Sequence, residues 1–272
     1  GHRDEVYLVS KVLPSNAGFE ATIAACEASL KRLGTDWIDL YLLHWPGATP
    51  FEQTIAAFER LMAQGKIRQY GVSNLDTADC RAFTAAGGRA MQVNQVLYNL
   101  DQRGIEWDLL DWMAENRRVT MAYSPFDGGA LLDHAGLARF ADARDMTSAQ
   151  VCLAWLLAHD NVLPIPKSAT PERVAENAES AHWQLDAEDM ASFRVGVEPP
   201  VSIDFKGTSV YGCGPWCQGP ALLQALKLLD SLVKQPGLEI STRFTVASVY
   251  QNLGQGVKAE QQNGIAREAL KQ

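Results

Sequence analysis

Six short apolar runs within the first 170 residues each lead into a polar side chain that could bind a ligand or move a proton. These residues are Lys11, His44, Ser73 and Asn74, Asn94 and Gln95, Tyr123 and Ser124, and Lys167 and Ser168. Amines and imidazoles act as general acids and bases, while hydroxyls and amides hydrogen-bond to polar groups of a ligand. Each residue alone has a structural explanation, such as a helix cap at Ser73 or a solvated turn at Lys11. Their recurrence at six successive runs instead favours one shared polar site.

The stretch DLYLLHWPG (39–47) contains the most informative of these residues, because His44 ends a run that is otherwise apolar. A short apolar run bounded by Asp39 and Pro46 is typical of a strand buried on both faces. A histidine at its end is either satisfied by a backbone hydrogen bond at the edge of a core or directed toward a ligand. The run alone leaves both interpretations open.

The elements that must position these residues alternate between strand and helix. Strand-like runs cover 6–10, 37–43, 69–72, 91–96, 118–123 and 161–165, and helical patterns cover 19–33, 51–64, 76–86, 105–115 and 147–158. Such alternation predicts a parallel sheet whose strand C-termini gather at one face. About six strand–helix units are present, and the Gly-x-Gly-x-x-Gly turn of a doubly wound sheet is absent. We therefore predict an α/β fold of the (β/α)₈ TIM-barrel type, incomplete, with about six of the eight units.

The segment PIPKSATPERVAEN (164–177) predicts a phosphate site. Thr170 followed by Pro171 is typical of a helix N-terminus, where free backbone N–H groups and the positive end of the helix dipole attract anions. The side chains that would join them are Lys167, Ser168, Arg173 and Asn177. Two cations favour a ligand with a terminal phosphate, such as the ribose 2′-phosphate of NADP, over NAD. The alternative is an ordinary capped surface helix.

Composition narrows the class of protein. The 272 residues suffice for one large α/β domain or two small ones, and no run approaches the ~18 apolar residues of a membrane span. Residues 1–13 carry charges throughout and lack a signal-peptide cleavage site, so we expect a cytoplasmic location. A net charge of −8 without a basic run argues against binding to nucleic acid. Five scattered cysteines, with Cys213 and Cys217 as the close pair, predict neither a disulfide framework nor a metal site.

The motifs VYLVSKV, DLYLLHWPG, GKIRQYGVSN, VNQVLYN, AYSP and IPKSATPERVAEN occur in this order between residue 1 and about residue 195. In this combination the chain resembles the aldo-keto reductases, and among them bacterial members that reduce methylglyoxal and similar small aldehydes. The resemblance implies a (β/α)₈ barrel that binds NADPH across its C-terminal mouth. It further implies an oxidoreductase that passes hydride from the nicotinamide to the carbonyl carbon of a small-molecule substrate.

For the chemical step, the resemblance implies four residues: a Tyr that protonates the carbonyl oxygen, a Lys that lowers the pKa of that Tyr, an Asp that pairs with the Lys, and a His that orients the substrate. Lys11 and His44 match two of these positions. For the cofactor, the resemblance implies that Ser73, Asn74 and Gln95 hold the carboxamide and that Tyr123 stacks on the nicotinamide ring. It also implies that Lys167, Ser168, Arg173 and Asn177 bind the adenosine 2′-phosphate end, and Ser124 is a further candidate for cofactor binding.

No residue of this chain matches the family's Asp or Tyr, and strand-like sequence starts within about five residues of Gly1. We therefore expect that the sequence given lacks its own beginning, including two strand–helix units, and that this chain is a weak or inactive reductase. The alternative is a non-catalytic NADP-binding fragment that serves as an interaction or sensor subunit. Turnover distinguishes the two hypotheses, because both predict cofactor binding and only the reductase predicts a product.

A change in composition near residue 197 predicts a second unit. Residues 1–200 carry 17 basic and 27 acidic side chains, whereas residues 201–272 carry 7 and 5, and the junction at 198–200 is typical of a linker. We predict domains at 1–197 and 198–272. Residues 201–229 resemble a segment of the γ-glutamyltransferase large chain, without that family's Thr nucleophile. A loop is expected at 211–220, with helices at 221–233, 241–253 and 256–270; the sequence does not predict the oligomeric state.

Overall fold

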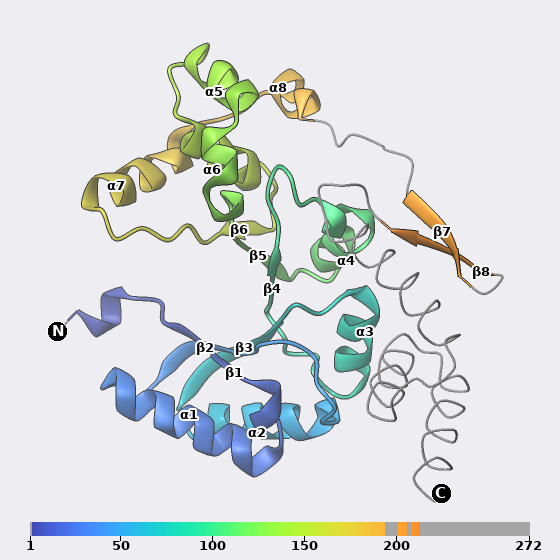
Figure 1. Cartoon of the computed structure of the whole chain (residues 1–272). Coiled ribbons are helices and arrows are strands. Elements are labelled where there is room, and N and C mark those ends of the chain that lie inside the picture. The colour runs from blue at the N-terminus through green and yellow to red at the C-terminus, as the bar shows by residue number, and fades with distance from the viewer. Residues whose placement is uncertain (1, 194–200, 206–207, 213–272) are drawn as a thin grey trace, which may run out of the picture. The chain divides into compact units, whose positions relative to one another are not determined.

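The computed structural model describes residues 2–193, 201–205 and 208–212 (Figure 1). Contacts within the chain divide it into two compact units, Gly1–Val195 and Gly196–Gln272. The predicted linker at 198–200 and the helices predicted at 221–233, 241–253 and 256–270 lie outside the described residues, as do Cys213 and Cys217.

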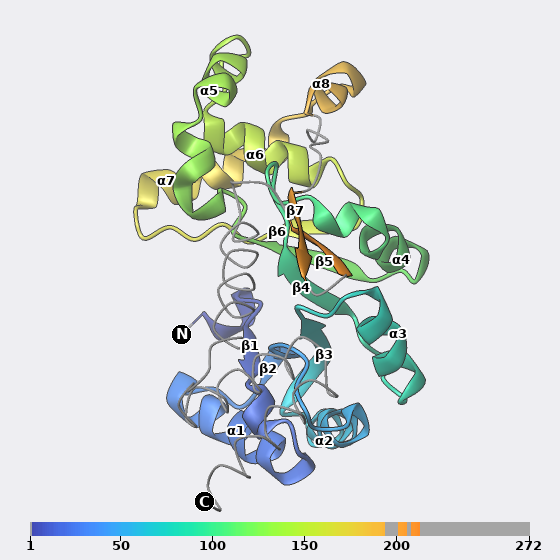
Figure 2. The ribbon, with the colours of Figure 1, turned by 45° about the vertical axis from the view of Figure 1, so that its right-hand side comes forward.

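A six-stranded parallel sheet forms the frame of the first unit (Figures 1 and 2). Its strands are β1 (Val9–Val12), β2 (Ile38–Leu43), β3 (Ile67–Ser73), β4 (Val93–Leu97), β5 (Val119–Tyr123) and β6 (Val162–Pro164). Each strand pairs with the next along the chain. The predicted α/β fold with six strands is therefore confirmed. Among the described residues β1 and β6 each have one neighbour, so the sheet has two edges, which a closed barrel lacks.

Helices follow the strands, as parallel connections require. They are α1 (Phe19–Leu33), α2 (Phe51–Ala63), α3 (Thr77–Ala85), α4 (Leu109–Glu115), α5 (Ala135–Asp142), α6 (Ser148–Leu157), α7 (Pro171–Glu179) and α8 (Ala187–Ser192). The predicted helices at 19–33, 51–64, 76–86 and 147–158 agree with α1, α2, α3 and α6 to within one residue at either end. The helix predicted at 105–115 is divided into a 3₁₀ turn, Gly104–Trp107, and α4.

The strand predicted at 6–10 is misplaced, because β1 begins at Val9. Residues Arg3–Glu5 form a 3₁₀ turn, and the Arg3 guanidinium donates to the Val6 carbonyl oxygen at 2.8 Å and to Asp39 Oδ2 at 2.7 Å. These bonds tie a 3₁₀ turn to Asp39 of β2, so the chain before β1 does not continue as a strand. Val6 and Tyr7 consequently remain 54% and 59% exposed despite their apolar pattern.

The two faces of the sheet carry different cores. The outer face contributes Tyr41 and Tyr70 to the largest apolar cluster, where they pack with Phe58 of α2 and Phe83 of α3. The inner face carries a separate cluster made of Leu40, Leu42, Val93 and Met121, with Val9 and Ile165 against it. Because neighbouring side chains along a strand alternate between faces, these clusters fix which residues at the strand ends point inward.

Gly71 lets the inner face close tightly between β2, β3 and β4. A Cβ atom at this position would lie 2.4 Å from the Val93 carbonyl oxygen and 2.9 Å from Leu42 Cδ2. Both distances are below van der Waals contact, so the inner packing of these three strands depends on the absence of a side chain here.

The described residues of the second unit form a hairpin, in which β7 (Val201–Phe205) pairs antiparallel with β8 (Thr208–Gly212). The loop predicted at 211–220 is therefore wrong at its first two residues, which belong to β8. Alternating apolar and polar residues in VSIDF carry the strand signal. No helix among the described residues is long and apolar enough to cross a membrane.

Candidate functional site

The strand pairings bring the predicted residues at the strand ends to one rim of the inner face. Lys11 pairs with Leu42 of the inner cluster, and His44 follows two residues later. Ser73 pairs with Gln95, which in turn pairs with Met121, two residues before Tyr123. Since paired residues in a parallel sheet share a face, residues from β1 to β5 gather at one rim. This rim is the first part of the candidate site.

Lys11 and His44 form the pair with acid–base potential. The His44 backbone N–H donates to the Val12 carbonyl oxygen at 3.0 Å, and its ring lies 4.4 Å from the Trp45 ring, centroid to centroid. Burial lowers the pKa of His44, and the nearby charge of Lys11 lowers it further. Burial likewise lowers the pKa of Lys11. The environment therefore favours a neutral imidazole, which can donate or accept a proton.

Asn74 connects the rim residues through its side-chain amide. Its Nδ2 atom donates to the His44 carbonyl oxygen at 3.0 Å and to Ser73 Oγ at 3.1 Å, while its Oδ1 accepts from the Tyr123 hydroxyl at 3.0 Å. Ser73 Oγ in turn donates to the Gln95 carbonyl oxygen at 2.8 Å. Asn74 adopts a left-handed backbone with φ of 58°, a conformation that asparagine tolerates better than most residues. One amide thus joins the ends of β2, β3 and β5.

Gln95 and Asn94 are adjacent in β4, but their side chains lie on opposite faces of the sheet. Gln95 is buried, and its Nε2 contacts the weakly accepting sulfur of Met121 at 2.9 Å, so a better acceptor could displace this partner. Asn94 donates to the Leu75 carbonyl oxygen at 2.8 Å and is fully buried. Because Asn94 pairs with Val72 of the outer cluster, it does not belong to the inner rim. Its place among the polar strand ends in the sequence is therefore coincidental.

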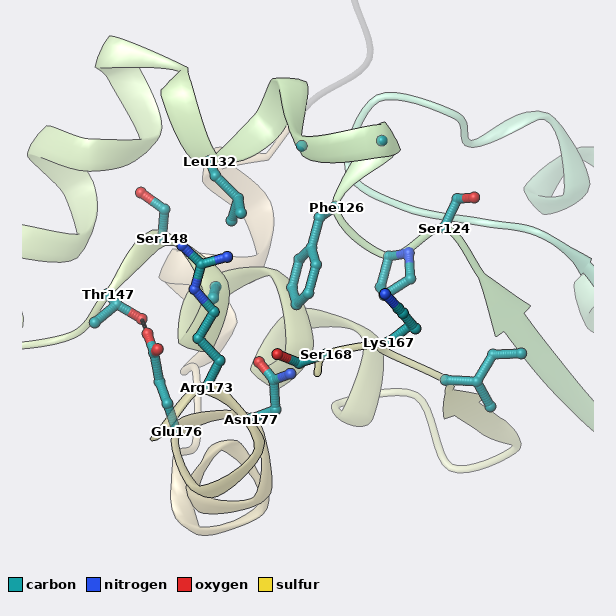
Figure 3. Close-up of a pocket in the computed structure, with 15 residues that line it drawn as sticks. Ser124, Phe126, Leu132, Thr147, Ser148, Lys167, Ser168, Arg173, Glu176 and Asn177 are labelled. Atoms are coloured by element: carbon teal, nitrogen blue, oxygen red, sulfur yellow. Dashed lines mark hydrogen bonds between the residues drawn. The ribbon is translucent and has the colours of Figure 1, made fainter. Parts of the chain in front are cut away.

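The second part of the candidate site is a pocket of about 700 Å³ beside α6 and α7 (Figure 3). Five of the predicted cofactor-binding residues line it: Ser124, Lys167, Ser168, Arg173 and Asn177. Figure 3 shows Arg173 and Asn177 extending into the pocket from the same helix, with Lys167 on the side of Ser124. The structure thus brings two cations and several hydroxyl or amide groups to one cavity, which is a favourable environment for an anion.

The N-terminus of α7 opens this part of the site. Pro171 occupies the first helical turn and Thr170 the N-cap position, as predicted, but the Thr170 side chain makes no capping hydrogen bond. Ser168 Oγ instead accepts from the Thr170 N–H at 3.1 Å. The Thr170 side chain therefore does not cap the first-turn N–H groups of α7. A bound anion could accept hydrogen bonds from these groups.

The pocket also contains residues that the sequence analysis missed. Glu176 lies on the same face of α7 as Arg173 and accepts a 2.5 Å hydrogen bond from the hydroxyl of Thr147. Thr147 forms a capping box with Gln150 at the start of α6. The signals were present in the sequence, since Glu176 follows Arg173 by three residues and Thr-x-x-Gln precedes an apolar run. No cluster of His, Cys, Asp or Glu suited to a metal ion occurs among the described residues.

Two family models match this chain, over ranges that overlap at residues 167–195. The model of the aldo/keto reductase family matches residues 1–195, and that of gamma-glutamyltranspeptidase matches residues 167–260. The sequence is 49% identical over 197 residues to methylglyoxal reductase YeaE of Escherichia coli, covering 70% of this chain and 69% of that protein. It is 38% identical over 188 residues to glyoxal reductase of Bacillus subtilis, covering 69% of this chain and 67% of the relative.

Solved structures give the same result for the fold. A crystal structure of an aldo-keto reductase from Klebsiella pneumoniae in complex with NADPH superposes with a TM-score of 0.69 at 47% sequence identity, covering 71% of this chain and 70% of that one. The six parallel strands and the residues at their C-terminal ends lie within the matched region. The chain therefore belongs to the aldo-keto reductase family.

Proposed function

We propose that this chain binds NADP(H) and acts on small aldehydes of the methylglyoxal type in a hydride-transfer reaction. The observation that carries the proposal is the pocket that gathers Lys167, Ser168, Arg173 and Asn177 at the N-terminal end of α7. Two cations near unpaired backbone donors fit a phosphate monoester, and the additional charge of NADP over NAD fits them better. Similarity to a methylglyoxal reductase and a glyoxal reductase supports the substrate class.

The residues present fit the cofactor along its length. Lys167, Ser168, Arg173 and Asn177 would hold the adenosine end, and Ser124 lines the same pocket. At the rim, Ser73, Asn74 and Gln95 offer a hydroxyl and two amides to a carboxamide, and the Tyr123 ring offers a flat surface to the nicotinamide. When bound, NADPH supplies the hydride for carbonyl reduction.

His44 and Lys11 would act at the substrate. The low pKa of His44 favours a neutral ring, which can donate a hydrogen bond to a carbonyl oxygen on which negative charge develops. Lys11 at the neighbouring strand end would add positive charge to the same region. Lys11 and His44 match two of the four groups that the resemblance implies, and no residue of the sequence matches its Tyr or its Asp. We therefore propose that catalysis by this chain is impaired by the ~10²–10⁴-fold that general acid catalysis contributes.

A second candidate function is supported by the contrast between the predicted cofactor-binding residues and the predicted catalytic residues. The pocket at α7 gathers five predicted cofactor-binding residues, whereas the rim offers two predicted catalytic ones. That distribution suits a protein that binds NADP without turning over a substrate. Such a protein would serve as an interaction or sensor subunit.

Turnover of methylglyoxal tests which proposal holds. The purified chain is mixed with NADPH and methylglyoxal, and NADPH oxidation is followed by absorbance, with His44→Gln as the matched variant. The impaired-reductase proposal predicts slow oxidation that His44→Gln lowers further. Oxidation at the ordinary enzymatic rate of about 10 s⁻¹ would refute impairment. Cofactor binding with no His44-dependent oxidation would favour the non-catalytic candidate.

A further inference from the structure

Among the described residues, the side-chain amide of Gln95 has one hydrogen-bond partner, the sulfur of Met121. Gln95 Nε2 lies 2.9 Å from Met121 Sδ. The two residues are paired across β4 and β5, and they are only 5% and 4% exposed. Strands β4 and β5 each lie between two other strands, so the contact is in the interior of the sheet, away from its edges. The register of these two strands therefore fixes the contact.

Met121 belongs to an apolar layer on the inner face of the sheet. The same cluster contains Leu40, Leu42 and Val93, whose side chains have no polar atoms. Within this cluster the Met121 thioether is therefore the one side-chain group that can form a hydrogen bond. A thioether has no proton to donate, so it acts as an acceptor only. The end of the Gln95 amide that faces the layer must consequently be the donor, Nε2.

This contact decides which atom of the Gln95 amide is presented to the rim. Nε2 and Oε1 are the two ends of a planar amide group, so Oε1 is directed away from Met121. No described residue donates to Oε1, and the atom is not among the fully buried side-chain atoms that lack a partner. A stronger acceptor could displace the sulfur only by turning the amide, which would leave Oε1 against the apolar layer without a donor. A ligand at the rim therefore meets an acceptor.

We propose that Met121 is a positioning residue, which holds the Gln95 amide so that Oε1 accepts a hydrogen bond from the N–H₂ group of the nicotinamide carboxamide. This inference rests on the proposed binding of NADP(H). A carboxamide has both donors and an acceptor, whereas a carboxylate in its place has acceptors only. The site therefore prefers NADP⁺ to nicotinic acid adenine dinucleotide phosphate, the analogue that carries the carboxylate. Without the sulfur the amide can turn toward either group, and the preference decreases.

Calorimetric titration of the whole chain with both dinucleotides tests the preference. Met121→Leu conserves the side-chain volume and removes the sulfur. We expect the ratio of dissociation constants, analogue over NADP⁺, to fall at least about tenfold, because the turned amide donates to the charged carboxylate. Met146→Leu is the matched control, since Met146 is also buried but lies in the cluster of α5 and α6, and it should keep the parent ratio. In a Gln95→Ala background, Met121→Leu should no longer change the ratio.

NMR spectra of the cofactor-free chain make the test independent of the proposed function. The ¹⁵N signal of the Gln95 side-chain amide is identified by its absence in Gln95→Ala. We expect Met121→Leu to shift this signal and to speed its exchange with water, and Met146→Leu to do neither. An unchanged signal and exchange rate in folded Met121→Leu, or an unchanged ratio where both dinucleotides bind, would overturn the role of Met121. A shifted signal in a chain that binds neither dinucleotide would support that role and refute the proposed function.

Discussion

The Tyr123 hydroxyl donates a 3.0 Å hydrogen bond to Asn74 Oδ1, so the ends of β5 and β3 are joined across the end of β4. This bond fixes the orientation of the Asn74 amide, whose Nδ2 then faces the His44 carbonyl oxygen. Asn74, which is proposed to hold the carboxamide, is thereby hydrogen-bonded to the backbone of His44, which is proposed to orient the substrate. Cofactor binding at Asn74 would have to exchange or extend these bonds.

Tyr123→Phe should weaken NADPH binding modestly, because it removes this bond but keeps the ring. A net contribution of about 0.5–1.5 kcal/mol corresponds to a roughly 2- to 12-fold increase in Kd. Fluorescence titration with NADPH measures it. Tyr7→Phe is the matched control, since the Tyr7 hydroxyl also donates to an amide oxygen, that of Gln69, on the exposed surface before β1. A larger loss in Tyr7→Phe than in Tyr123→Phe would contradict the assignment.

Arg173→Gln should weaken NADPH binding by about 12- to 160-fold, as expected when a charge-assisted hydrogen bond of about 1.5–3 kcal/mol is lost. NADH lacks the 2′-phosphate, so its affinity should change little. The comparison of both dinucleotides by fluorescence titration isolates the phosphate contact. Arg139→Gln, on the exposed last turn of α5, is the control and should bind both as the parent chain does. Equal losses for NADPH and NADH would show that Arg173 does not bind the 2′-phosphate.

Gly71→Ala should destabilise the first unit by about 1–3 kcal/mol, as overpacking of a close-packed core does. The added Cβ would lie 2.4 Å from the Val93 carbonyl oxygen, so β3 and β4 would have to separate. The melting temperature reports the effect. Gly104→Ala is the control, because a Cβ there meets nothing within 4 Å. An unchanged melting temperature for Gly71→Ala would contradict the observed packing of the inner face.

The Asp39 carboxyl should make the free energy of unfolding depend on pH in the acidic range. Burial by itself would raise the pKa of Asp39, but hydrogen bonds from the Leu8 N–H and Arg3, together with the charge of Arg3, hold it below its usual value. A carboxyl with a depressed folded-state pKa stabilises the fold above its unfolded-state pKa of about 3.9, and this contribution is lost as pH falls through the folded-state value.

Denaturant unfolding of Asp39→Asn at several pH values measures this contribution. The variant should be less stable than the parent by about 1–3 kcal/mol near neutral pH, because the partly buried contact between Asp39 and Arg3 at 2.7 Å is lost. The difference should shrink below about pH 4. Asp36→Asn, an exposed neighbour, should show neither effect. A stability difference that grows on acidification would contradict the sign of the shift.

Much of the frame could be predicted because each strand–helix unit carries its own local signal. Apolar runs fixed the presence of six strands, and the helical periodicity of 19–33 matches α1. The position of β1 could not be predicted, because the Arg3 bond to Asp39 joins residues 36 positions apart and competes with the local strand pattern. The short α5 was missed for lack of a long apolar period.

Contacts between residues far apart in the sequence also limited the prediction of the site. The sequence order places Asn94 and Gln95 side by side, and only the pairing of β3 with β4 reveals that Gln95 faces the rim and Asn94 the outer core. Likewise, the contact between Thr147 and Glu176 spans 29 positions and depends on how α6 and α7 pack. Residue types identified the candidate members of the site, while the register of the sheet and the packing of helices decided which of them meet.

The relative affinity of the whole chain for NADPH and NADH tests the central claim most directly. Both dinucleotides are titrated into the purified 272-residue chain at fixed ionic strength, and binding is followed by cofactor fluorescence. We predict binding of NADPH that is at least about tenfold tighter than that of NADH, since the 2′-phosphate gives Lys167 and Arg173 an anionic partner that NADH lacks. Equal affinities, or no binding of NADPH, would contradict it.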